Sequence, residues 1–423
     1  MNRARSFRIR FLSRNVTTQA VFFLPRIHTN LREGVFNFLA FSSYRLRRIL
    51  TLIVCLLMAG CAADPVATPT PKPTPTSWPR ARLKSPEYGI QMFAWWKPEI
   101  ARRDLDLVRD MGFTWVKQQF AWRDIEGLAK GRYTWEAADD IVRRATNRRL
   151  KILARIDRQP FWAQAPGSEP EENAPPANMQ DFADFCYTLA DRYRDRIHAY
   201  QVWNEPNLSR EWGGKPPDPA GYVELLKACY IAIKRADPNA LVISAGMAPT
   251  GTWTEGVMPD AMFVEKMYEA GAAPYFDLLG VHAPGFKAPP EASPDETAAD
   301  PKLGGQRFFS FRHVEDLRKL MVKHGDADKQ VAVLEMGWTT DPIHPEYAWH
   351  AVDERTQADY LVRAFEFAKE NWSPWIGIMT VIGLADPVWT PDDEQYWWTV
   401  VYPDWPETRV KPAYEALKAM PKE

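Results

Sequence analysis

Residues 198–205 read HAYQVWNE, a strand-like run that ends in a carboxylate. The aromatic residues Tyr200 and Trp203 favour a buried strand. Pro206 follows, and because proline has no N–H to donate, it cannot continue a central strand. Glu205 is therefore predicted to lie where a strand stops and a loop begins. A carboxylate in that place is costly to bury unless it has partners or a chemical task.

This strand is one of a series in which strand-like and helix-like runs alternate from residue 88 to the end of the chain. The helical runs show 3.6-residue spacing of apolar side chains, and the strands are short and largely apolar, as in a parallel sheet covered by helices. Eight such pairs predict an α/β fold, a (β/α)8 TIM barrel in one domain. The predicted strands are 88–93, 114–122, 151–157, 198–205, 240–246, 277–283, 330–338 and 375–383.

A doubly wound open sheet is the alternative arrangement of the same elements. Such a sheet normally carries a Gly-rich phosphate loop after an early strand, and the sequence has none. The barrel is therefore the preferred interpretation.

The composition narrows the class of protein. The 423 residues include 53 basic and 54 acidic side chains, a balance that argues against a nucleic-acid partner. The 18 tryptophans invite a ligand that stacks on flat rings, and sugars are such ligands. Cys186 and Cys229 lie on apolar helix faces, as buried thiols or, in an exported protein, as a pair. No Cys/His spacing indicates a metal site, and no cofactor is predicted.

The N-terminal segment is predicted to be an export address. Residues 45–61 read RLRRILTLIVCLLMAGC, in which basic residues precede an apolar run of signal-peptide length. The ending resembles a bacterial lipobox and predicts lipidation of Cys61; an ordinary signal peptide is the alternative. Thr and Pro then alternate, which favours an extended linker. We predict a signal region at 1–60, a lipidated cysteine and linker at 61–80, and the barrel at 81–423.

A second carboxylate is predicted at the same end of the barrel. In a (β/α)8 barrel the active site lies at the C-terminal ends of the strands, and Glu205 ends the fourth. Glu335 lies near the end of the seventh, where Val331, Val333 and Glu335 are predicted to alternate onto one face. Two glutamates that converge across the barrel mouth are the minimum equipment for glycoside hydrolysis.

The sequence here resembles glycoside hydrolase clan A, and most closely family 39 and its relatives, with family 5 next. WNEP at 203–206 resembles the clan's acid/base motif, and LEMGW at 334–338 resembles its nucleophile motif. The likeness extends from about Tyr88 to Leu417. It implies a retaining glycosidase in which Glu335 attacks the anomeric carbon and Glu205 transfers the proton, with a pKa raised by burial and by Glu335.

The resemblance also suggests residues that bind the sugar, and it shows departures from the clan. The amide of Asn204 would bond the sugar 2-hydroxyl. Lys117 takes the place of a common arginine, Pro284 that of a frequent tyrosine, and the tryptophan usual after the eighth strand is absent, with Trp389 as its substitute. The further predicted substrate contacts, each with plain packing or an interior ion pair as its alternative, are His282, Trp338, Trp122, Trp162, Trp389, Lys117 and Asp157.

Three functions follow from these residues. The first is hydrolysis of a β-linked glycan by double displacement with two glutamates. The second, prompted by the missing tyrosine and tryptophan, is a catalytically inactive, surface-tethered carbohydrate-binding barrel. The third is a transglycosylase, which shares the covalent intermediate and differs in whether water or a sugar intercepts it.

Overall fold

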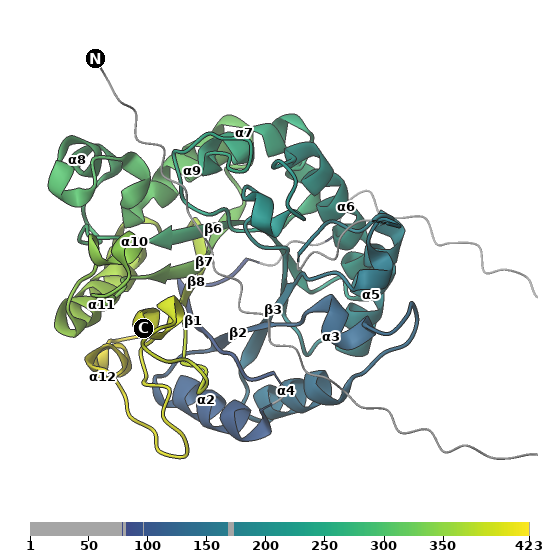
Figure 1. Ribbon diagram of the computed structural model, residues 1–423, viewed down its shortest axis with the longest axis horizontal. Helices are drawn as coiled ribbons and strands as arrows, with labels where there is room; N and C mark the ends of the chain where they lie inside the picture. The colour runs from purple at the N-terminus through teal and green to yellow at the C-terminus, as the bar shows by residue number, and fades with distance from the viewer. Residues whose placement is uncertain (1–77, 79–81, 96, 168–172, 423) are drawn as a thin grey trace, which may run out of the picture. The chain divides into compact units, whose positions relative to one another are not determined.

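The computed structural model describes residue 78 and residues 82–95, 97–167 and 173–422. Within these residues eight parallel strands close into a barrel in the order β1 to β8, with β8 paired to β1, and helices surround the strands (Figure 1). The predicted TIM barrel is confirmed. The predictions of a signal region and of lipidation at Cys61 fall outside the described residues.

The strands agree with the predicted ones to within a few residues. They are β1 Glu87–Gln91, β2 Trp115–Gln119, β3 Lys151–Ile156, β4 Ala199–Val202, β5 Leu241–Ser244, β6 Leu278–Pro284, β7 Gln330–Gly337 and β8 Ile376–Val381. The second and the fourth strands each end three residues earlier than predicted, so Glu205 lies beyond the end of β4.

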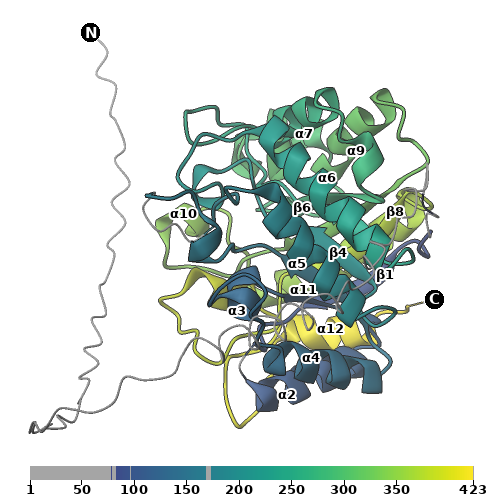
Figure 2. The same ribbon diagram turned by 90° about the vertical axis from the view of Figure 1, so that its right-hand side faces the viewer.

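In the part of the chain that the structure describes, eight helices form the outer layer and three short ones lie in the connections. The helices are α2 Pro98–Asp110, α3 Trp122–Glu126, α4 Glu136–Asn147, α5 Met179–Arg192, α6 Pro219–Ala236, α7 Asp260–Glu269, α8 Pro294–Ala299, α9 Val314–Lys323, α10 Pro345–Ala348, α11 Glu354–Asn371 and α12 Pro412–Ala419. Figure 2 shows α5, α6, α7 and α9 following one another around the barrel wall. None of the described helices is long and apolar enough to cross a membrane.

Helices α5 and α6 illustrate why the outer layer forms. Asn178 and Asp218 precede them and cap the free backbone N–H groups of their first turns. Cys186 and Cys229 are fully buried where the two helices meet, and they form a disulfide. Of the two alternatives left open by the sequence, the structure therefore has the pair. Large apolar side chains of α5, such as Phe185, are also fully buried against the barrel.

The barrel interior is a packed apolar core towards the N-terminal ends of the strands. Towards their C-terminal ends it is polar, and this open end is called the barrel mouth. Side chains that point inward from the lower part of the strands form a separate apolar cluster, made of Trp115, Leu153, Ala199, Leu241, Ile243, Leu278, Ala332, Leu334 and Ile378. Charged and amide side chains replace the apolar ones towards the C-terminal ends of the strands. This change of polarity places the functional end of the barrel where the fold predicts it.

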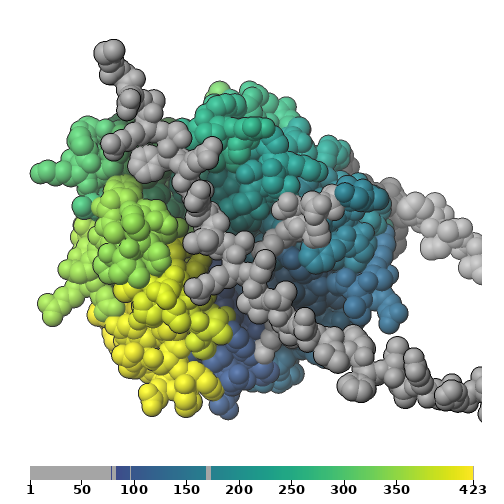
Figure 3. Space-filling view, in the orientation of Figure 1, coloured from purple at the N-terminus to yellow at the C-terminus, as the bar shows by residue number. Residues whose placement is uncertain are grey.

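The connections after β6 and β8 are the longest ones at this end. Residues 285–313 between β6 and α9 contain α8 and short 3-10 turns, and the segment after β8 contains the 3-10 helix η7, Glu394–Trp398. In the space-filling view the yellow C-terminal part of the chain adjoins the light-green region near residue 350 (Figure 3). These segments carry further groups towards the mouth.

Candidate active site

An unusual backbone conformation presents Glu205 to the barrel mouth. Strand β4 ends at Val202, and both Trp203 (φ 72°) and Glu205 (φ 44°) adopt left-handed conformations that non-glycine residues rarely take. The Glu205 N–H donates to the carbonyl of Gly246 after β5, at 3.0 Å. Strain of this kind persists where the surroundings fix it, and it gathers at functional sites.

The side chain of Trp203 helps to hold this strained backbone in place. It is fully buried, packs edge-on against Phe182 and Trp212, and donates its indole N–H to the carbonyl of Glu211 at 2.8 Å. Because Trp203 is turned outward into the helix layer, the two residues that follow it return to the mouth. In the WNEP motif, the buried Trp203 therefore fixes the backbone and thereby positions the carboxylate of Glu205.

A β-bulge, and not the predicted alternation of side chains along β7, brings Glu335 to the barrel mouth. Ala332 and Leu334 point into the barrel, so strict alternation would send Glu335 outward to the helices with Val331 and Val333. A β-bulge interrupts the register between β6 and β7, where Val281 pairs with Val333 but His282 pairs with Glu335. The extra residue turns Glu335 inward. The prediction that all three residues share one face was wrong, although the position of the carboxylate was right.

The two carboxylates lie close together. One oxygen of Glu205, one of Glu335 and a ring nitrogen of His282 all lie within 4.8 Å of one another. Retaining glycosidases hold their carboxyl groups roughly 5–5.5 Å apart, whereas inverting enzymes need roughly 6.5–9.5 Å to admit a water. The observed separation fits the retaining geometry.

Positive charge surrounds Glu335. Lys117 Nζ lies 2.8 Å from Oε1, and Arg155 Nη1 lies 3.9 Å from the same oxygen. Burial raises the pKa of Glu335, but Lys117, His282 and Arg155 outweigh it and hold this pKa at about 2. Glu335 is therefore ionised at neutral pH, as an attacking carboxylate must be.

Glu205 has partners on both of its oxygens. His282 Nδ1 lies 3.0 Å from Oε1, and Arg210 Nη2 donates to Oε2 at 3.2 Å. Burial raises the pKa of Glu205, but the hydrogen bond and charge of His282, with help from Arg210, outweigh it and leave the pKa below its ordinary value. The predicted rise of this pKa is thus not found, because the prediction counted burial and Glu335 but neither of these two partners.

The position of His282 depends on a glycine in the neighbouring strand connection. A Cβ atom on Gly246 would lie 2.1 Å from Cδ2 of the imidazole, so no other residue leaves room for the ring. His282 is 3% exposed, and its Nε2 has no hydrogen-bond partner. It touches Glu205, while Glu335 lies farther away, at 3.9 Å. The predicted rim histidine therefore belongs to the acid/base carboxylate.

Two of the predicted binding residues serve the framework of the site. Asn204 is 7% exposed, beside Glu205, and its Oδ1 accepts from Gln201 Nε2 at 3.1 Å. Asp157 is fully buried and pairs with Arg155 Nε at 2.7 Å, which holds that guanidinium near Glu335. For Asp157 the structure shows the interior ion pair rather than a surface open to a ligand.

The prediction that tryptophan rings contact the sugar was wrong for two of the four residues. Trp122 and Trp338 are both fully buried and cannot offer a ring face to a sugar. Trp122 begins α3 and packs on Phe185, and Trp338 donates its indole N–H to the carbonyl of Ala288. The physical reason is that an indole following a strand can equally turn beneath the next helix.

The two other predicted tryptophans are half-buried. Trp162 donates its indole N–H to the Glu126 carbonyl at 2.6 Å, and Trp389 packs edge-on against Phe93. The large exposed aromatic rings in the described connections after strands are others, namely Phe161, Trp253, Trp349 and Trp405. Exposure of a ring depends on the path of its loop, which the sequence pattern did not reveal.

Arg210 and Glu211 were also missed by the sequence reasoning. Both belong to the 3-10 helix η2, Ser209–Glu211, directly after the acid/base motif. Glu211 Oε2 accepts from Asn173 at 2.7 Å, and burial raises the pKa of Glu211. The signal in the sequence was an Arg–Glu pair five and six residues after Glu205, in a connection that the fold places at the mouth.

A divalent cation would find its best-spaced ligands among the described residues at Glu205, His282 and Glu335. However, Lys117 and Arg155 already place two positive charges beside Glu335. Like charges so close disfavour a further cation there. The arrangement is better suited to acid, base and nucleophile chemistry by the side chains themselves.

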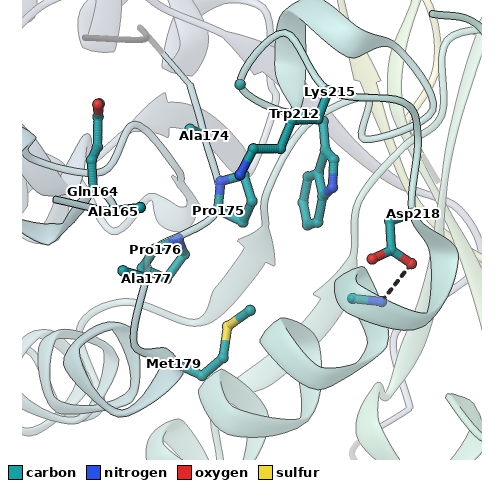
Figure 4. A pocket seen from close by; sticks show the side chains of 12 residues that line it. Gln164, Ala165, Ala174, Pro175, Pro176, Ala177, Met179, Trp212, Lys215 and Asp218 are labelled. Carbon is teal, nitrogen blue, oxygen red and sulfur yellow. Dashed lines mark hydrogen bonds between the residues drawn. The ribbon is translucent and has the colours of Figure 1, made fainter. Parts of the chain in front are cut away.

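A separate pocket of about 230 Å³ lies between the β3–α5 connection and the segment before α6 (Figure 4). The Trp212 indole, Pro175 and Met179 line it. Its carboxylate, Asp218, is occupied in capping α6 through the Gly221 N–H. None of its lining residues belongs to the two-glutamate site, so the reaction is not placed in this pocket.

Comparisons with known proteins show which families this chain resembles. Residues 75–274 match the family model described as cellulase (glycosyl hydrolase family 5). This match includes Glu205 and ends before Glu335. No curated protein matches the sequence.

Solved structures share the fold. A family 39 glycoside hydrolase from the gut symbiont Bacteroides cellulosilyticus WH2 is 20% identical, with a TM-score of 0.57 over 79% of this chain and 63% of that one, so this chain spans less than two thirds of that protein. A family 39 β-xylosidase from Caulobacter crescentus is 17% identical, with a TM-score of 0.54 over 81% and 71%. A xylanase from Paenibacillus barcinonensis is 16% identical, with a TM-score of 0.50 over 80% and 96%.

The barrel, the two convergent glutamates and the family 5 match over residues 75–274 make this chain similar to glycoside hydrolases of the clan A TIM-barrel type. Within that clan the sequence model that matches is family 5, and the similar structures include members of family 39.

Proposed function

We propose that the protein hydrolyses a β-linked oligo- or polysaccharide with retention of anomeric configuration. The observation that carries this proposal is the pair of carboxylates within 4.8 Å, one of which is held ionised by Lys117 and Arg155. That separation suits direct attack on the sugar rather than attack by an interposed water.

In the first step Glu335 attacks the anomeric carbon and forms a glycosyl ester. Glu205, which must carry a proton at that moment, gives it to the leaving oxygen as the glycosidic bond breaks. The Nζ of Lys117 orients the attacking carboxylate at 2.8 Å. His282 fixes Oε1 of Glu205 and leaves Oε2 to face the leaving group.

In the second step Glu205 takes a proton from water, which attacks the anomeric carbon and releases Glu335. The ester has no charge, so the negative Glu335 no longer raises the pKa of Glu205. The low pKa that His282 and Arg210 impose then suits Glu205 to act as a base. The same carboxyl thus serves as acid before the ester forms and as base after it.

The exposed rings of Phe161, Trp253 and Trp349 are the best candidates for stacking on sugars. Their spread over connections after β3, β5 and β7 supports a substrate of several sugar units. The proposal extends to export and lipid anchoring at Cys61, which the Cys186–Cys229 disulfide supports, since such bonds persist in oxidising compartments.

The test is a hydrolysis screen of residues 81–423 with aryl β-glycosides and β-glycans, alongside Glu205→Ala and Glu335→Ala. We expect both variants to lose activity on glycans, and azide to restore turnover in both. The azide product should have inverted configuration with Glu335→Ala and retained configuration with Glu205→Ala. Equal glycan binding by all three proteins without cleavage would instead identify a tethered sugar-binding barrel, and transfer to an added sugar in place of hydrolysis would identify a transglycosylase.

A further inference from the structure

Arg210 contacts the oxygen of Glu205 that the reaction requires. Oε1 of Glu205 is held at 3.0 Å by the His282 ring, whose side chain is 2% exposed. A ring so enclosed cannot give way to a substrate. Oε2 is therefore the oxygen that must hand a proton to the leaving group, and Arg210 Nη2 lies 3.2 Å from it.

This contact fills the place of the leaving oxygen. A general acid works on an atom roughly 2.6–3.2 Å away, which is the distance at which the guanidinium stands. An arginine in that place also favours the ionised form of the carboxylate. Glu205 is thus unsuited to donate a proton as long as Arg210 remains on Oε2.

The contact is easy to break. The Arg210 side chain is 69% exposed, and its second ion-pair partner, Glu211 Oε1, is 3.7 Å from Nε. Exposed pairs of this kind contribute little to stability. By contrast, the pair between Lys117 and Glu335 involves a lysine side chain that is 1% exposed. The acid/base carboxylate therefore has one permanent partner and one removable partner.

We infer that Arg210 is a positioning residue that covers Oε2 of Glu205 in the protein without substrate and is displaced when the leaving-group sugar enters. This inference rests on the proposed hydrolysis. The cover keeps the proton-transfer oxygen from acting before the position of the leaving group is filled.

Other charged groups also face Glu205 and set the background for a titration. They come from β3, β6, β7, η2 and η7, and they are Arg155, His282, Glu335, Glu211 and Glu394. Replacing Arg210 alone leaves all of these in place. A change in the titration of Glu205 in that variant therefore reports the arginine.

The first measurement is the Glu205 pKa in the protein without substrate, from the carboxyl 13C signal of protein labelled at glutamate and assigned with Glu205→Gln. We expect Arg210→Gln to raise this pKa by roughly 0.5–1 unit, the lower part of the range for an adjacent charge because the arginine is exposed. Arg210→Lys should restore part of the shift. Arg194→Gln, which breaks an exposed pair with Asp191 on the outer layer, should leave it unchanged.

The second measurement is the pH dependence of turnover. The basic limb of kcat/KM reports the free enzyme and that of kcat reports the substrate complex. Displacement of the arginine predicts that Arg210→Gln moves the kcat/KM limb to higher pH and leaves the kcat limb in place. Equal movement of both limbs would show that the arginine stays on the carboxylate, and an unchanged pKa in the empty protein would refute the contact itself. Because the titration needs no substrate, it separates loss of this contact from failure of the hydrolysis proposal.

Discussion

Replacing Lys117 by methionine should shift the acidic limb of the pH–rate profile. Lys117 Nζ lies 2.8 Å from Glu335 Oε1 and is the largest of the influences that lower the pKa of Glu335. Methionine keeps much of the length and volume of the side chain and removes its charge. Glu335 would keep Arg155 and His282, both with contacts at 3.9 Å.

The size of the effect follows from these contacts. An adjacent opposite charge lowers a carboxyl pKa by roughly 1–3 units, and each unit corresponds to about 1.4 kcal/mol. Starting from a pKa of about 2, the Glu335 pKa in Lys117→Met should lie at roughly 3–5. The sign is fixed, because removing a cation makes the carboxylate harder to ionise. Activity should therefore fall on the acidic side at a higher pH than in the wild type.

The assay is kcat/KM for a cleaved aryl glycoside from pH 3 upward, with the stability of each protein checked at every pH. Lys234→Met is a matched control. It breaks another buried lysine–carboxylate pair, with Nζ 2.7 Å from Asp277 Oδ2 and both side chains 1% exposed. The control should lower the free energy of unfolding by roughly 3–5 kcal/mol and leave the acidic limb unmoved. An acidic limb in Lys117→Met that coincides with the wild type would refute the assignment of Glu335 as the ionised nucleophile held by this lysine.

Three further predictions test the framework. Replacing both Cys186 and Cys229 by alanine should lower the free energy of unfolding by roughly 2–4 kcal/mol, seen as a lower guanidinium midpoint; an unchanged midpoint in oxidised protein would argue against the disulfide. His313 lies 2.8 Å from Asp260 and its pKa is raised to about 9, so its stabilising effect is complete below pH 6.5 and is lost as pH rises through 9; the advantage of wild type over His313→Gln should fall by roughly 3 kcal/mol across that window. Gly246→Ala should displace the site histidine and reduce kcat/KM by at least about tenfold, whereas Gly271→Ala, in open space at a turn, should cost stability and leave kcat/KM unchanged.

Much of the fold and part of the site could be predicted from the sequence. The alternation of strand and helix periods predicts the barrel because each period reflects local packing against one sheet. Glu205 and Glu335 were predicted because each lies near the C-terminal end of a strand, and the structure brings those ends together. Side-chain exposure was harder to predict, since the burial of Trp122 and Trp338 depends on which helix covers them.

The sequence by itself determined the class of fold, and it predicted the end of the barrel and the two carboxylates to which we assign the chemistry. Tertiary structure alone decided how those carboxylates are aimed and charged. The bulge that turns Glu335 inward depends on the register between two strands, and Lys117 meets Glu335 across 218 residues of sequence. Orientation and pKa depend on distances of a few ångströms between groups far apart in the chain, and local sequence patterns carry no measure of those distances.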